Sequence, residues 1–458
     1  MSDLKKNPLA GLTIEQYGSQ LRSGLLSAEE TTCAFLDRIA QLDRKLAAYT
    51  FVDTSGALEA ARAIDASLKA GFDFGPLMGV PIAVKDLYHV DNMPLKAGSK
   101  LDISGIVGRE GTLIRALKRG GCIILGKTWT SEFALGGINF LQNVPWNPWD
   151  SGVHHTPGGS SGGSAVAEAA GLCAFALGTD TGGSVRMPAA LCGVLGHKFA
   201  ADAFPGDGIF PLSPTLDSIG TFTSCAADAA IIFSALTGIS VPEIQIKGLR
   251  IGKPEGAFYQ DLDSEVAAAM NQAFSRLASA GAEIVPVAIP ELLEVESVFG
   301  RIVPIELIAI LGADRLKRGL DQLDPVSRSR IEPAMELRAT DYISAHMRHT
   351  ELRRRIAEHM DKCDCWITPT TPALAAPLAD IPDAATAAKW NRQALRNTRP
   401  DNVFGNCGVS LPLPATASPV GLQISCTSGH DAILLGITRE IESILGIAQR
   451  PDVTGFSS

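Results

Sequence analysis

The chain has 458 residues, of which 46% are hydrophobic and 19% are charged, so it can bury a large core. Its net charge of −9 argues against a surface for nucleic acid or for an anionic membrane. Residues 1–8 lack the apolar core of a signal peptide, and no apolar run approaches the ~18 residues of a spanning helix, so we expect a cytoplasmic protein.

The first part of the chain alternates helical and strand-like segments. The apolar run Val80–Val84 predicts a buried strand that ends at Lys85. An amphipathic helix is expected at Thr112–Arg119, followed by a strand at Cys122–Leu125. The letters around that second strand match a phosphate-binding loop, but the order of helix, turn and strand is the reverse of what a phosphate cradle needs. We therefore do not expect nucleotide binding.

Two glycine-rich loops that carry serines follow. Gly158–Ser164 contains Ser160 and leads into a helix of small residues. The second loop, Gly178–Ser184, comes after an apolar strand at Leu172–Leu177 and before a helical turn that closes at Gly193. Such a loop directs backbone N–H groups and partial positive charge to one point. The pattern therefore predicts a nucleophilic serine with an oxyanion hole.

A serine nucleophile also needs a proton acceptor. None of the eight histidines lies in a Gly-x-Ser-x-Gly elbow or in a recognisable Ser-His-Asp order. The alternative is Lys85, whose amine has an ordinary pKa of about 10.4. Burial at the end of an apolar strand lowers that pKa, because it disfavours the charged form. The sequence therefore predicts a serine hydrolase whose base is an amine.

The rest of the chain predicts further helices and strands. Val266–Ala280 has a helical apolar stripe, and residues 301–362 are helical and charged. Residues 367–400 are rich in proline and alanine and are expected to be an irregular cover near the site. A strand at Val420–Cys426 and a helix at Asp431–Gly446 end the pattern.

Together these residues resemble the amidase signature family, whose members use a Ser–cis-Ser–Lys triad. The resemblance rests on G-V-P-x-x-V-K-D around Lys85, G-G-S-S-G-G around Ser160 and G-T-D-x-G-G-S-[IV]-R around Ser184. The three residues lie 75 and 24 positions apart along the chain, as is typical of the family. The similarity runs from about residue 20 to about residue 447, and it defines the family far more closely than the substrate.

The resemblance implies an α/β fold with three α/β/α layers, in which helices flank a large twisted mixed sheet that is mostly parallel. We expect a single amidase domain over residues 1–458. Its parts are an N-terminal helical part at 1–70, a catalytic core at 75–225, and the remaining strands, helices and cover segments at 226–458.

The resemblance also implies the roles of the site residues. Ser184 is the acylated nucleophile, Ser160 is the bridging serine after a cis peptide bond at Gly159, and Lys85 is the neutral base. Ser161 is expected to help fix Lys85. Two lists complete the set. The oxyanion hole is formed by the backbone N–H groups of Thr181, Gly182, Gly183 and Ser184. The nucleophile loop is held from behind by a pair between Asp180 and Arg186.

The predicted activity is hydrolysis of amide C–N bonds through a Ser184 acyl-enzyme, with esters, anilides and carbamates or urethanes as related substrates. The apolar residues between Ile138 and Trp146 favour an aryl or alkyl amide. Two alternatives stay open: a glutaminase-like subunit of a tRNA transamidation complex, and a non-catalytic scaffold with the same fold.

Partners and cofactors follow from the same pattern. Nine scattered cysteines have no metal-ligand spacing, so we expect reduced thiols, no metal and no organic cofactor. The expected partner is a small amide or carbamate substrate, with no nucleic acid and no membrane, and the expected state is a monomer or homodimer.

Overall fold

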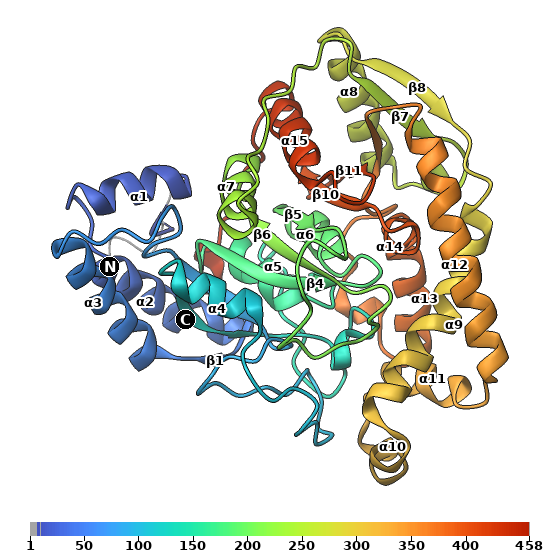
Figure 1. Cartoon of the computed structure of the whole chain (residues 1–458), viewed down its shortest axis with the longest axis horizontal. Coiled ribbons are helices and arrows are strands. Elements are labelled where there is room, and N and C mark those ends of the chain that lie inside the picture. Colours follow the sequence, from blue (N-terminus) through green and yellow to red (C-terminus); the bar gives the residue numbers. More distant parts are fainter. Residues whose placement is uncertain (1–6, 10, 458) are drawn as a thin grey trace.

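A computed structural model of the chain describes residues 7–9 and 11–457. It is organised around one eleven-stranded sheet that helices flank (Figure 1). The strands lie in the order β1-β3-β2-β4-β6-β5-β10-β11-β9-β7-β8. Their bounds are β1 Tyr49–Val52, β2 Pro81–Lys85, β3 Ile123–Thr128, β4 Phe175–Asp180, β5 Leu195–Lys198, β6 Ser218–Thr223, β7 Arg250–Pro254, β8 Glu283–Val287, β9 Cys365–Pro369, β10 Cys407–Pro412 and β11 Gly421–Cys426.

The α-helices gather at the N-terminal end and along the faces of the sheet (Figure 1). Their bounds are α1 Ile14–Arg22, α2 Ala28–Leu46, α3 Thr54–Lys69, α4 Thr112–Arg119, α5 Gly162–Ala169, α6 Arg186–Cys192, α7 Ala226–Thr237, α8 Ser264–Ser279, α9 Leu292–Leu311, α10 Ala313–Gly319, α11 Pro325–Ala334, α12 Ala339–Met360, α13 Ala384–Ala394, α14 Arg399–Phe404 and α15 Asp431–Leu445. In the described part of the chain, none of them has both the length and the apolar character that a membrane crossing requires.

The sheet is mixed, as predicted, but it is not mostly parallel. β2 pairs in parallel with β3 and β4, and β7 pairs in parallel with β8 and β9. The other six neighbouring pairs are antiparallel. A short connection favours this outcome, because antiparallel neighbours need only a turn whereas parallel ones need a long crossover. β10 and β11 are separated by residues 413–420 alone, too few for a crossover helix.

The elements that carry the site agree with the sequence except at one boundary. β2 ends at Lys85, and α4 precedes β3, which confirms the order of helix, turn and strand. β4 extends to Asp180 instead of ending at Leu177, so Thr179 and Asp180 belong to a strand and not to a loop. After the loop, α6 ends at Gly193, whose φ of 70° is the left-handed conformation that glycine adopts readily.

One further prediction is wrong. Residues 367–400 are not wholly irregular, because they contain α13 and the start of α14. An N-cap explains the first of these helices: the Asp383 side chain accepts a hydrogen bond from the Thr386 N–H at 2.8 Å. The predicted helices at Val266–Ala280 and across 301–362 are confirmed, the latter as α9 to α12.

Candidate active site

Lys85 lies at the carboxyl end of β2 and is completely buried. Its Nζ donates hydrogen bonds to Ser160 Oγ at 2.7 Å and to Thr179 Oγ1 at 2.8 Å. Both partners are neutral hydroxyls, so neither compensates a charge on the amine. Burial lowers the pKa of Lys85 to about 7, although the carboxylates of Asp217 and Asp180 act in the opposite direction. The amine is therefore neutral in a substantial fraction of molecules near neutral pH.

Ser160 stands in the first glycine-rich loop, directly after a cis peptide bond between Gly159 and Ser160. The side chain is fully buried, and its carbonyl oxygen accepts a hydrogen bond from the Ser131 N–H at 3.3 Å. Glycine is required before it, because a Cβ at Gly159 would lie 2.9 Å from Gly137 Cα. The loop thus presses against the Gly137 backbone and presents the Ser160 hydroxyl to Lys85.

Ser184 lies in the second loop, directly before Val185, the residue that caps the start of α6. The Ser184 carbonyl accepts a hydrogen bond from the Ser161 N–H at 3.3 Å, which ties the two serine loops together. The Ser184 side chain is 6% exposed and makes no hydrogen bond with the described residues. In particular, its hydroxyl is not hydrogen-bonded to that of Ser160, a contact that catalytic groups often form only once substrate is bound.

The backbone of the nucleophile loop supplies free donors. Within the described residues, the N–H groups of Thr181, Gly182 and Ser184 make no hydrogen bond. Gly183 differs, because its N–H donates to Asp180 Oδ1 at 2.7 Å. Its predicted place among the oxyanion donors therefore conflicts with this geometry. Three of the four predicted N–H groups remain available.

Ser161 does not touch Lys85, which corrects a second detail. Its Oγ donates to the Thr179 carbonyl at 3.2 Å and accepts from the Thr179 N–H at 3.3 Å. Thr179 is the residue that contacts the amine, and the sequence analysis missed it. A signal was present: Asp180 faces Arg186, and successive side chains of a strand point to opposite faces, so Thr179 must face the other way.

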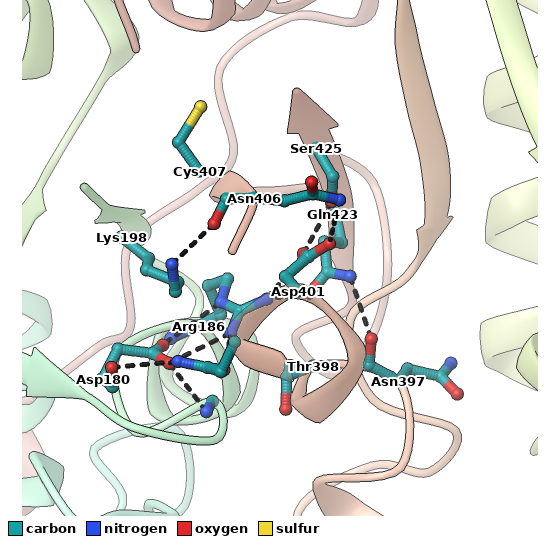
Figure 2. Close-up of polar contacts among 12 residues, drawn as sticks. Asp180, Arg186, Lys198, Asn397, Thr398, Asp401, Asn406, Cys407, Gln423 and Ser425 are labelled. Carbon is teal, nitrogen blue, oxygen red and sulfur yellow. Dashed lines mark hydrogen bonds and ion pairs between the residues drawn. The ribbon is translucent and has the colours of Figure 1, made fainter. Parts of the chain in front are cut away.

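The predicted pair behind the loop is present (Figure 2). Arg186 Nη2 and Nε donate to the Asp180 carboxylate at 3.0 Å and 3.2 Å, and both side chains are fully buried. The same carboxylate accepts the N–H groups of Gly183 and Val185. Arg186 and these N–H groups hold the pKa of Asp180 well below its ordinary value despite its burial. The carboxylate therefore organises the turn that carries Ser184.

The other side of Arg186 faces residues that the sequence did not single out (Figure 2). Arg186 Nη1 donates to Asp401 Oδ2 at 2.7 Å and to Gln423 Oε1 at 3.1 Å. Asp401 also accepts the Ser425 hydroxyl at 2.7 Å. The buried ion pair thus extends from the nucleophile loop to α14 and β11. No local motif marks Asp401 or Ser425, because only the fold brings them to Arg186.

A cavity of about 330 Å³ adjoins the lysine side of the site. Thr179 and Asp217 line it together with Leu87 and Phe210. Asp217 accepts hydrogen bonds from Thr181 Oγ1 at 2.5 Å and from the Ser213 N–H at 3.0 Å. Burial raises the pKa of Asp217 to about 6. Among the residues that the structure describes, no group of three or more His, Cys, Asp or Glu side chains is arranged to hold a metal ion.

The fold and the site define the class. A crystal structure described as an amidase covers 95% of this chain and 100% of its own, with a TM-score of 0.86 and 29% identity. Native peptide amidase from Stenotrophomonas maltophilia covers 98% and 100%, with a TM-score of 0.83 and 26% identity. The eleven-stranded mixed sheet is therefore the amidase-signature fold.

The family follows from the sequence comparison. The model of the family named Amidase matches residues 30–435, and the chain belongs to that family of hydrolases. The 2-amino-5-chloromuconic acid deaminase of Comamonas testosteroni is 38% identical over 95% of this chain and 97% of its own. A glutamyl-tRNA(Gln) amidotransferase subunit of Desulfotalea psychrophila is 33% identical over 95% and 98%.

Proposed function

We propose that the protein hydrolyses amide C–N bonds through an acyl-enzyme on Ser184, with Ser160 and Lys85 as the proton relay. The observation that carries the proposal is the buried 2.7 Å contact between Lys85 Nζ and Ser160 Oγ, made by an amine whose pKa burial lowers to about 7. An amine of that pKa can accept a proton near neutral pH, which an ordinary lysine cannot.

The relay proceeds through hydroxyls. Neutral Lys85 accepts the proton of Ser160 while Ser160 takes that of Ser184, and Ser184 Oγ bonds to the substrate carbonyl carbon. The free N–H groups of Thr181, Gly182 and Ser184 hold the oxyanion. The proton returns through Ser160 to the leaving nitrogen as the C–N bond breaks, and a water molecule repeats the sequence on the acyl-enzyme.

Thr179 has a positioning role in this scheme. A neutral amine has two N–H donors and one lone pair. Because one N–H is donated to Thr179 Oγ1, the lone pair can be turned toward the Ser160 hydroxyl. Esters, anilides and carbamates or urethanes present the same carbonyl chemistry and are proposed as further substrates. We propose small-molecule turnover by a cytoplasmic monomer or homodimer.

A second candidate function is that of a glutaminase-like subunit that works with partner proteins on charged tRNA. The Desulfotalea relative, which is named as part of an amidotransferase and is 33% identical, favours it. The 38% identical Comamonas protein, named as a deaminase, favours a stand-alone enzyme instead. Hydrolysis of simple amides by the purified chain, without added protein, would distinguish the two.

Active-site labelling tests the proposal. A fluorophosphonate probe should modify the wild-type protein on the Ser184 peptide, as read by mass spectrometry, and Ser184→Ala should abolish the label. Ser164→Ala is the matched control, because its hydroxyl is hydrogen-bonded to Thr128 Oγ1 and the Leu177 carbonyl and not to the relay. A wild-type protein that takes no label, and hydrolyses no amide, ester or carbamate, would be the non-catalytic scaffold.

A further inference from the structure

Three arginines gather beside the nucleophile loop around a single carboxylate. Arg330 is on α11, Arg392 on α13 and Arg399 at the start of α14, and they interact electrostatically with one another and with Glu296 of α9. Arg399 Nη1 forms an ion pair with Glu296 Oε2. The group therefore has more cationic than anionic side chains, an arrangement that a bound anion would neutralise.

Arg399 reaches the catalytic loop itself. Its guanidinium stacks on the Phe299 ring at 4.5 Å, and the residue is only 3% exposed. A Cβ built on Gly182 would lie 3.8 Å from Arg399 Nε and 2.9 Å from the Phe299 ring, so both side chains border the proposed oxyanion donors. Arg399 Nε is buried and has no hydrogen-bond partner in the described structure. A donor left in this state costs roughly 1–3 kcal/mol unless a ligand accepts from it.

Arg330 provides a second, independent observation. The side chain is half-buried, and it makes no hydrogen bond or ion pair with any residue in the described ranges. Burial and the neighbouring Arg399 lower its pKa to about 10, so it stays charged at neutral pH. Its helix also packs near the first serine loop, because Val326 Cγ1 is 3.4 Å from the Cβ position of Gly136, next to the Gly137 backbone that borders Gly159.

We propose that Arg330 and Arg399 bind a carboxylate of the substrate, so that the enzyme selects amides of carboxylic acids whose second acid group is free. The inference rests on the proposed function and specifies its substrate class. Guanidinium groups match the planar carboxylate in shape and charge, and such charge-assisted hydrogen bonds are about twice as strong as neutral ones. The Glu296 carboxylate next to Arg399 disfavours a doubly charged phosphate, which leaves the singly charged carboxylate as the better ligand.

Calorimetric titration of the Ser184→Ala protein tests this without requiring turnover. The ligands are succinamate, glutaramate and adipamate, each compared with its uncharged diamide. At least one acid should bind about tenfold or more tightly than its diamide, and Arg330→Met should remove that preference. Arg330 has no partner to lose, so this variant should fold normally. Arg328→Met on the same helix is the matched control, because Arg328 is exposed and paired with Glu332, and it should keep the preference.

Three results would overturn the inference: no acid binds better than its diamide, the preference survives both Arg330→Met and Arg399→Met, or inorganic phosphate binds more tightly than every acid. These results say nothing against Ser184 as the nucleophile, which the fluorophosphonate label reads separately. Conversely, an unlabelled Ser184 with intact acid preference would refute the hydrolytic mechanism and leave the carboxylate site standing.

Discussion

Lys85 has the most unusual environment of the site residues, because its amine is fully buried and hydrogen-bonded only to two hydroxyls. We predict that kcat/KM rises with pH and levels off above an apparent pKa of about 7, since only the neutral amine accepts a proton. Lys85→Met should lower kcat/KM by about 100-fold or more and remove this titration. A pH–rate profile of both proteins between pH 5 and 9 is the measurement, and a flat wild-type profile would exclude the amine as base.

The same substitution should increase stability. In the unfolded chain Lys85 titrates at its ordinary value of 10.5, but in the folded protein at about 7. Between these values the unfolded state binds more protons, so the wild-type free energy of unfolding rises with pH. The gain from Lys85→Met is therefore largest below about pH 7 and falls toward pH 10.5. Denaturant unfolding across this range would show it, and equal stability at every pH would mean that the lysine is solvated.

At the scale of the elements, the Arg186 ion pairs join five pieces of chain: the end of β4, the start of α6, α14, β10 and β11. Asp401 is the centre of the distal half, because it accepts from Arg186, Ser425 and Asn406. We predict that Asp401→Ala lowers the free energy of unfolding by about 3–5 kcal/mol, since it leaves a buried guanidinium partly unpaired. Denaturant unfolding monitored by circular dichroism measures the change.

An exposed ion pair gives the control for this prediction. Glu351 of α12 accepts hydrogen bonds from Arg354 and Arg355 on the surface. Glu351→Ala should change the free energy of unfolding by no more than about 1 kcal/mol, because solvent screens the pair. Similar losses in the two variants would mean that the Arg186 network contributes no more than a surface contact.

The elements also show what the sequence could and could not predict. Local patterns were sufficient for β2 with Lys85 at its end, for both serine loops and for the Asp180–Arg186 pair, because motif residues lie close along the chain. The antiparallel pairing of β10 with β11 was missed, since apolar runs define strands but not their direction. Asp401 and Arg399 were missed because their partners lie more than 100 residues away.

The whole molecule is organised by one sheet that runs from β1 near the N-terminus to β11 near the C-terminus, which supports the prediction of a single domain over residues 1–458. Its interior also holds the cysteines: eight are buried, and Cys33 is half-buried. Burial raises the pKa of the Cys122 and Cys192 thiols far above the ordinary value, and that of Cys225 to about 12. At neutral pH these thiols are protonated and unreactive.

We therefore predict that a thiol-specific disulfide reagent modifies only Cys33 rapidly in the native protein, and all nine cysteines after unfolding in guanidinium. Cys33→Ser should leave the native protein without a fast-reacting thiol. Because the proposed chemistry uses Ser184, amidase activity should persist after native labelling. The time course of reagent release, with activity measured in parallel, is the test. Fast release from several thiols would mean that the sheet opens as a whole, whereas loss of activity on labelling Cys33 alone would connect α2 to the site across the core.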